Sequence, residues 1–424
     1  MKKNKSKKIT KNIMRINLRF KFFMEEVENF FSLVSKILPD IQKKEISSFK
    51  KRINSIKKDV KSERMSLVRY FNSINEIHLN IMKVFSHKQL LLNSSFVFLI
   101  SNLEYLLKEI LRELLLIYPE KIEDKKSNIT ISEIKSLNNI QEVNSLMINK
   151  HIRYFMFCEF KEQLKIIFKF LDISEKDLYV DLSLLERAYK TRNLILHNSA
   201  MITKDSISYL IEAREKDVNK RYSVPYEILK KIYNEILSLG IILIFFLDLR
   251  INDHNFIKEN LSYIAVDLLK QKHYNALISI YLSTKSNLQY LEGNDIICND
   301  INYLIALKHL PNRNKDFKRE LSKLKFEHFD PLYKAAIYVL KGDKKKFIEI
   351  CKKTDLTLED WNEFPLFEDF RKDKKVFAKI KKILIENSQK RNAEQKKIFR
   401  KGTTKKKTKI KKINNKKKTE NAKR

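Results

Sequence analysis

An arginine, an asparagine and a histidine interrupt an otherwise apolar run near the middle of this 424-residue chain. They are Arg192, Asn193 and His197, within the stretch "ERAYKTRNLILHNSA". A histidine can take or give a proton near neutral pH, and an arginine can hold a phosphate with two hydrogen bonds and stabilise charge on its oxygens. Asn193 can position the phosphate or the histidine. Together these side chains suit cleavage of RNA, whose own 2′-hydroxyl is the nucleophile.

The surrounding pattern predicts a helix in which Arg192 lies on the apolar side. At about 100° per residue, the apolar positions form one arc about 140° wide, with Arg192 near its middle. The arc consists of Leu184, Leu185, Ala188, Tyr189, Ile195 and Leu196. A guanidinium there is costly unless an anion meets it. A purely structural interpretation is therefore that Arg192 pairs with Glu104 or Glu186 while His197 caps the helix.

The stretch "ERAYKTRNLILHN" resembles the signature of the HEPN superfamily of ribonucleases and RNA-binding domains, an R-x4-6-H motif late in a helix with a polar residue after the arginine. The resemblance extends to "SSFVFLISNLEYLLKEILRELLLIYPE", which looks like the family's first long helix, and to "NITISEIKSLNNIQEV". It covers about 85–250 and is closest to the RiboL-PSP and abortive-infection-type branch. After Asn198, the residues "SAMI" replace the glycine-containing turn of many members.

This resemblance implies a metal-independent endoribonuclease without a cofactor. Arg192, Asn193 and His197 would be catalytic, and Glu104 and Asn198 would bind substrate or support the site. Positions five apart on a helix point about 140° apart, so one motif does not make a compact site. The family implies the remedy, a homodimer whose motif helices form a shared cleft. It also implies a role in anti-phage defence or as a toxin, with an antitoxin or trigger protein bound by the C-terminal helices.

Two other classes of function stay open. The HEPN-like core can bind RNA without cutting it, with the C-terminal helices acting as a scaffold. Alternatively, the protein is a membrane-surface or protein-interaction adaptor that uses its lysine-rich tail.

The composition predicts an all-α protein. Four glycines and six prolines are too few for the turns of a large β or doubly wound architecture. The glycines lie far apart, so neither a P-loop nor a GxGxxG turn can form. Three single cysteines and eight scattered histidines show no metal-binding spacing.

The formal charge of +35 is concentrated at the two ends of the chain. Residues 396–424 carry a net +14 and residues 1–22 a net +9, which leaves +12 for the rest. Such basic ends raise the rate of encounter with any polyanion without reading its sequence, so RNA, DNA and anionic lipid all fit the charge.

Four regions are predicted. They are a basic helical extension over 1–80, a HEPN-like helical domain over 81–250, a solenoid-like domain of helical hairpins over 251–386, and a disordered lysine-rich tail over 387–424. In the second, a long helix ends before Pro119, and capping boxes begin helices at Thr130 with Glu133 and at Ser183 with Glu186. Further helices are predicted at 151–171, 206–215, 225–249, 256–270, 273–283, 295–309, 315–325, 331–341, 343–352 and 373–386.

No secretory signal is expected, because charged residues break the first apolar stretch. The most apolar window, "LGIILIFFLDL" from Leu239, spans about a dozen residues where a bilayer needs about 20. We therefore expect a buried helix, no membrane span and a cytoplasmic protein.

Overall fold

The computed structural model describes residues 12–29, 67–121, 130–135, 137, 139–251, 255–290 and 293–391, with isolated positions between 43 and 55; the side chains of 67–88, 134, 255–259 and 289–290 are not described. Among these residues the chain forms helices, short 3-10 turns and no strand, apart from one isolated antiparallel bridge between Met201 and Arg221. The predicted all-α fold is confirmed.

The chain divides into two compact units. The first comprises residues up to Glu259 together with Ser279–Tyr290, and the second comprises Asn260–Ile278 and the residues from Leu291 onward. The boundary therefore passes inside two helices, α8 (Asn255–Lys270) and α9 (Tyr274–Thr284).

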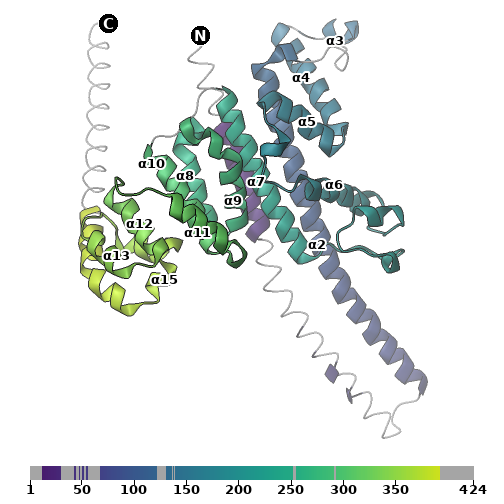
Figure 1. The fold of residues 1–424 in the computed structure, drawn as a ribbon. Coiled ribbons are helices and arrows are strands. Elements are labelled where there is room, and N and C mark those ends of the chain that lie inside the picture. The colour runs from purple at the N-terminus through teal and green to yellow at the C-terminus, as the bar shows by residue number, and fades with distance from the viewer. Residues whose placement is uncertain are drawn as a thin grey trace, which may run out of the picture. The chain divides into compact units, whose positions relative to one another are not determined.

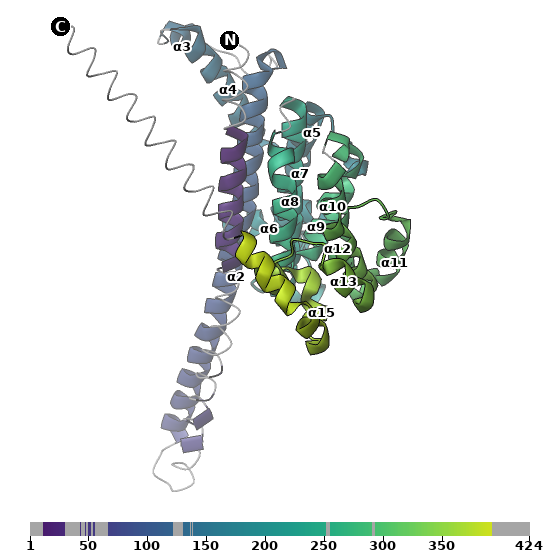
Figure 2. The same cartoon turned by 90° about the vertical axis from the view of Figure 1, so that its left-hand side faces the viewer.

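The first unit is organised around the long helix α2 (Leu67–Ile117), which ends just before Pro119 as predicted. Apolar side chains recur along it at helical spacing and are fully buried at Phe96, Leu99, Leu103, Leu107, Ile110, Leu111 and Leu114. Later in the chain, α4 (Ile140–Phe157), α5 (Phe160–Leu171), α6 (Leu182–His197) and α7 (Tyr226–Ile251) contact it (Figures 1 and 2). This packing holds the motif helix α6 across α2.

The helix over 12–29 packs within the first unit, although the sequence assigns it to a separate extension. It buries one apolar face, made of Ile13, Ile16, Phe20, Met24 and Val27. Asn12 Nδ2 donates to the buried carboxylate of Glu113 at 3.1 Å, and the Tyr233 hydroxyl donates to the carbonyl oxygen of Met24 at 3.2 Å. The N-terminal helix is therefore part of the core that positions α2 and α7.

Two predicted boundaries around α4 and α5 need correction. The expected helix over 151–171 is two helices, because Cys158 and Glu159 are extended. The amide of Gln163 donates to the carbonyl oxygens of Phe155 and Cys158 at 3.1 and 3.2 Å. It thereby satisfies the backbone acceptors that the break exposes.

The predicted helix over 206–215 is wrong. The segment contains only the 3-10 turns Asp205–Ser208 and Glu215–Asp217. Its carbonyl groups are satisfied by distant side chains instead of by a helical ladder: Arg187 donates to Tyr209 and Leu210, and the Tyr222 hydroxyl donates to Ile211 at 3.0 Å. These long-range bonds replace the local ones that the helical pattern suggested.

Other local predictions are confirmed. Thr130 and Glu133 form the predicted capping box of α3 (Ile131–Lys135): the Glu133 backbone N–H donates to Thr130 Oγ1 at 3.3 Å, and the Thr130 N–H donates to Glu133 Oε2 at 2.8 Å. Helix α7 begins after Pro225 as expected. Two stretches, Gln89–Ile117 and Tyr226–Ile251, have the length and composition of a bilayer span, but 56% and 78% of their apolar windows are buried in the structure. More than half of each apolar window is thus buried in the protein core.

The second unit is a series of short helices. After α8 and α9 come α10 (Gly293–Lys308), α11 (Asn314–Lys323), α12 (Pro331–Lys341), α13 (Lys344–Cys351), α14 (Leu358–Glu363), α15 (Glu368–Arg371) and a helix over 374–391. The predicted α12–α13 hairpin turns at Gly342, whose φ of 74° suits glycine, and Asp343 caps α13. Residues 387–391 are helical where a disordered tail was predicted, and 392–424 lie outside the described residues.

A glycine in α7 provides a test of the N-terminal packing. A Cβ at Gly240 would overlap the ring of Phe20. We expect Gly240→Ala to lower the free energy of unfolding by about 1–3 kcal/mol, although the same change in an open helix stabilises. Urea unfolding measures this.

Gly293→Ala is the matched control, because nothing lies within 4 Å of the Cβ it would add in α10. If Gly240→Ala were as stable as the wild type, the packing of Phe20 on α7 would be contradicted.

Candidate functional site

The motif helix α6 begins two residues earlier than a Ser183–Glu186 capping box requires, so that prediction is wrong. Its N-cap is Asp181, whose carboxylate accepts from the Leu184 N–H at 3.0 Å and from the Ser183 hydroxyl at 2.9 Å. Glu186 instead pairs with Lys190 at 2.9 Å. The hydroxyl of Ser183 donates to the Asp181 carboxylate, so Asp181 takes the N-cap position and Ser183 lies inside the helix.

Arg192 pairs with Glu104, as the structural interpretation of its position requires. Its Nη2 donates to Glu104 Oε2 at 2.9 Å, and the two side chains are only 21% and 15% exposed. Its Nη1 donates to Asn193 Oδ1 at 3.0 Å. Arg192 Nε is buried and has no hydrogen-bond partner among the described residues. The guanidinium is therefore oriented by Glu104 and turned toward the surface through Asn193.

A buried polar chain lies behind this ion pair. Burial, and then the charge and hydrogen bond of Glu104, raise the pKa of Tyr189 well above its usual value, so the hydroxyl stays protonated. The Tyr189 hydroxyl also lies 3.3 Å from Gln163 Oε1, and its ring stacks on Phe160. Sequence reasoning counted Tyr189 as a packing residue and gave no signal for Gln163. Tyr189 interacts with Glu104, and Gln163 in turn accepts from the Tyr189 hydroxyl.

His197 and Asn198 lie at the exposed end of α6. His197 is the last helical residue, and it forms no hydrogen bond or ion pair with a described residue. Asn198 is the C-cap, and its backbone N–H donates to the Leu194 carbonyl oxygen at 3.0 Å. Asn193 is also exposed, and it lies one helical turn before His197 on the same face.

The turn after the motif takes the shape that glycine would normally supply. Ser199 and Ala200 have φ values of 50° and 60°, in the left-handed region. Each costs of the order of 1–2 kcal/mol for a residue with a Cβ. The Ala200 N–H donates to the Leu194 carbonyl oxygen at 3.3 Å, and the Tyr222 N–H donates to the Ala200 carbonyl oxygen at 2.7 Å. The residues "SAMI", which replace the glycine-containing turn of many HEPN members, thus still form a left-handed turn, with backbone strain at Ser199 and Ala200.

The structure brings some of the predicted site residues together and not others. Glu104, Arg192 and Asn193 form one continuous set of contacts. Arg192 does not contact His197, in line with their separation around the helix. Of the apolar arc, Leu184, Leu185, Ala188 and Tyr189 are already buried within the chain, whereas Leu196 is 49% exposed. The arc therefore needs no second protomer to cover most of it.

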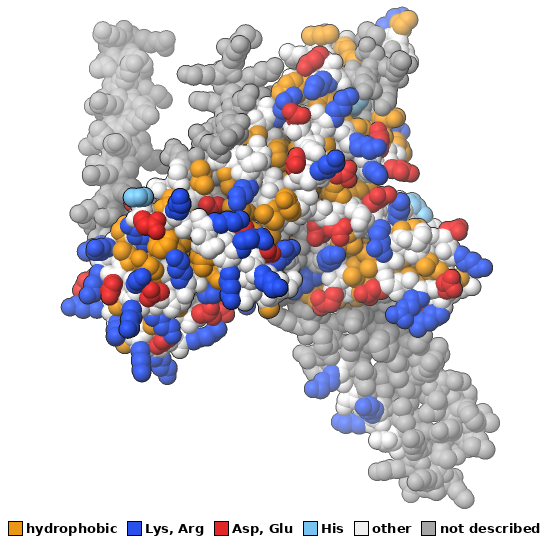
Figure 3. Space-filling model, viewed as in Figure 1, with side chains coloured by type: hydrophobic (Ala, Val, Ile, Leu, Met, Phe, Trp, Pro, Cys, Tyr) orange, Lys and Arg blue, Asp and Glu red, His pale blue; other side chains and the backbone are white. Residues whose placement is uncertain are grey.

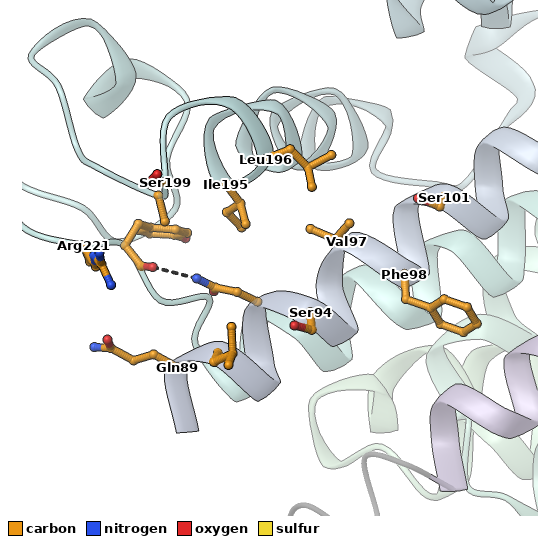
Figure 4. Close-up of a pocket in the computed structure, with 13 residues that line it drawn as sticks. Gln89, Ser94, Val97, Phe98, Ser101, Ile195, Leu196, Ser199 and Arg221 are labelled. Atoms are coloured by element: carbon orange, nitrogen blue, oxygen red, sulfur yellow. Dashed lines mark hydrogen bonds between the residues drawn. The ribbon is translucent and has the colours of Figure 1, made fainter. Parts of the chain in front are cut away.

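A cavity of about 600 Å³ lies beside the end of the motif. One wall is a face of α2, and the others are the last turn of α6, the strained turn and the segment at Arg221 (Figure 4). None of the five predicted site residues lines it, although Leu196 and Ser199 flank His197 and Asn198 in the chain. Sequence reasoning missed this cavity, because its walls come from two stretches of the chain, 89–101 and 195–222, that are far apart in the sequence.

Within the described residues, no group of three or more histidine, cysteine, aspartate or glutamate side chains could hold a metal ion. Comparison with known proteins finds no match: no family model, curated protein or solved structure is similar to this chain. The site must therefore be interpreted from its own geometry.

The Arg192–Glu104 pair provides a second test. Arg192→Ala leaves a mostly buried carboxylate without its cation, so we expect a double-mutant cycle with Glu104→Ala to give a coupling of about 1–2 kcal/mol in the free energy of unfolding. The exposed Lys190–Glu186 pair on the same helix is the control, with an expected coupling below about 0.5 kcal/mol. Equal couplings for the two pairs would show that Glu104 does not hold Arg192.

Proposed function

We propose that this protein is a metal-independent endoribonuclease that cleaves RNA by attack of the 2′-hydroxyl on the adjacent phosphate. The observation that carries the proposal is the line of side chains from the half-buried Glu104 through Arg192 to the exposed Asn193, with His197 one turn further on. It combines an oriented cation, an amide and an exposed imidazole, which are the groups that this reaction needs.

In the proposed reaction His197 takes the proton of the 2′-hydroxyl. The 2′-oxygen forms a bond to phosphorus, and the bond from phosphorus to the 5′-oxygen breaks. A protonated imidazole gives its proton to the departing 5′-oxygen, so the products carry a 2′,3′-cyclic phosphate and a 5′-hydroxyl. Arg192 stabilises the charge that builds on the phosphate oxygens. Glu104 acts as a positioning residue, Asn193 orients the phosphate, and Asn198 supports the end of α6.

The proposal includes a homodimer. Arg192 and His197 do not meet within one chain, so a second copy is needed to place a histidine near an arginine across a shared cleft. Leu196, exposed at the end of α6, can contribute to such an interface. The basic ends of the chain would add nonspecific affinity for RNA. On the face in Figure 3, Lys and Arg side chains are interspersed with acidic ones and form no single patch.

The proposed biological setting rests on the HEPN resemblance alone. It is a cytoplasmic toxin or anti-phage defence protein that stops growth by cutting RNA, with the C-terminal helices binding an antitoxin or trigger protein. These helices form hairpins such as α12–α13, which are common in protein-binding arrays.

A second candidate is an RNA-binding HEPN-like module that does not cut. The observation that favours it is the 2.9 Å pairing of Arg192 with Glu104, which occupies part of the guanidinium that a phosphate would use.

Cleavage of total RNA and tRNA in EDTA distinguishes the two candidates. We expect the wild type to cut and to leave 2′,3′-cyclic phosphate ends, and Arg192→Ala and His197→Ala to lose at least about 100-fold in rate. His328→Ala, which removes an exposed histidine of the second unit, should cut like the wild type.

Undiminished cutting by His197→Ala would contradict the assigned proton transfer. RNA binding by all four proteins without any cleavage would favour the binding module.

A further inference from the structure

The cavity beside the motif has the chemistry of a site for an anion that carries an apolar body. Its volume, about 600 Å³, is in the range of small-ligand sites. Val97 of α2 and Leu196 of α6 face each other across it, while Gln89 and Arg221 lie at one end (Figure 4). Among the described residues that line it there is no carboxylate.

Arg221 is the cation of this cavity, and its backbone is held in place from two sides. It forms the antiparallel bridge with Met201. The next residue, Tyr222, donates its N–H to Ala200 and accepts from Asn93 Nδ2 at 2.9 Å. Asn93 Oδ1 also accepts from the Val224 N–H at 3.0 Å, so both groups of this buried amide serve to pin the segment to α2.

The Arg221 side chain itself is free to bind a ligand. It is exposed, and no carboxylate among the described residues pairs with it. The other two arginines near the motif are engaged, Arg187 with two carbonyl groups and Arg192 with Glu104. An unpaired guanidinium carried on a fixed backbone at the mouth of a cavity suits a phosphate group.

The strained turn provides an independent indication. Ser199 and Ala200, the two consecutive left-handed residues, both line the cavity. Backbone strain of this kind persists where the surrounding structure enforces it, and it is found more often at binding sites. Here it shapes the wall that directly follows His197 and Asn198.

We infer that this cavity binds one nucleoside phosphate, with the base against Val97, Ile195 and Leu196 and the phosphate on Arg221. Gln89, Ser94 and Ser199 supply the donors and acceptors that a base edge or a ribose requires. The inference rests on the proposed function, because it assumes that this nucleoside phosphate is one unit of a single-stranded RNA, next to the nucleotide that is cut. A free mononucleotide has the same chemistry, and the experiment separates the two sources.

The test measures binding of a fluorescently labelled single-stranded RNA of about 12 nucleotides, by anisotropy across a salt titration. All proteins carry His197→Ala, so that the RNA stays intact. Arg221→Ala should bind about 10-fold more weakly and reduce the slope of log affinity against log salt by about 1. Lys220→Ala is the matched control, because it removes the same charge one residue away. The Lys220 side chain pairs with Asp217 and does not line the cavity, so this change should alter affinity by less than about twofold.

A second pair of variants tests the cavity without changing charge. Ser94→Trp fills it from α2, and Ser145→Trp adds the same ring to an exposed position of α4. We expect the first to weaken RNA binding and the second to leave it unchanged.

Adenosine monophosphate at millimolar concentration then separates the two sources of the ligand. If it displaces the RNA contact that depends on Arg221, the cavity binds the free nucleotide. If it does not, the cavity binds a unit of the strand.

Binding by Arg221→Ala and Ser94→Trp that matches their controls would overturn the inference, even if the wild type cleaves RNA. Conversely, weaker binding by both variants together with a wild type that never cuts would support the cavity and contradict the proposed nuclease. The two failures are therefore distinguishable.

Discussion

The ion pair between Arg192 and Glu104 is the interaction on which the site depends. It joins α6 to α2, two helices whose paired residues lie 88 positions apart in the sequence. Two charges in a mostly apolar interface are costly to desolvate, and only close geometry with further hydrogen bonds offsets that cost. Asn193 on one side, and Tyr189 with Gln163 behind Glu104, supply those bonds. The pair thus determines how α6 is rotated on α2, and so which of its residues reach the surface.

That rotation explains the division of roles along α6. With Arg192 held against Glu104, Asn193 and His197 face solvent, and the end of the helix meets the strained turn at Ser199 and Ala200. The same turn bonds to Tyr222 and so fixes Arg221 near the motif. The half-buried ion pair thus lies beneath a polar edge on α6, and the cavity lies next to the end of that edge.

Sequence reasoning succeeded where the local signal was strong. The apolar spacing of α2 and α7, the Thr130–Glu133 capping box and the glycine turn between α12 and α13 all depend on residues within a few positions of one another. It failed at 206–215, where the side chains of Arg187 and Tyr222 bond to the backbone from a distance.

The site was predictable only where it depends on a local pattern along α6. The pairing of Arg192 with a carboxylate followed from its place on an apolar face, and Glu104 was one of two candidates. The cavity was not predictable, since Gln89, Ile195 and Arg221 meet only in the folded chain. The contacts of Tyr189 with Glu104 and Gln163 could not be predicted for the same reason.

The central claim is that Arg192 and His197, which do not touch within one chain, form one cleavage site between two copies. The most direct measurement mixes Arg192→Ala and His197→Ala proteins, lets them exchange subunits, and follows RNA cleavage in EDTA. Each mixed dimer keeps one intact Arg192 and one intact His197 in the shared cleft, so the account predicts that two inactive proteins regain a substantial part of the wild-type rate. A mixture that exchanges subunits and stays as inactive as its parts would contradict it.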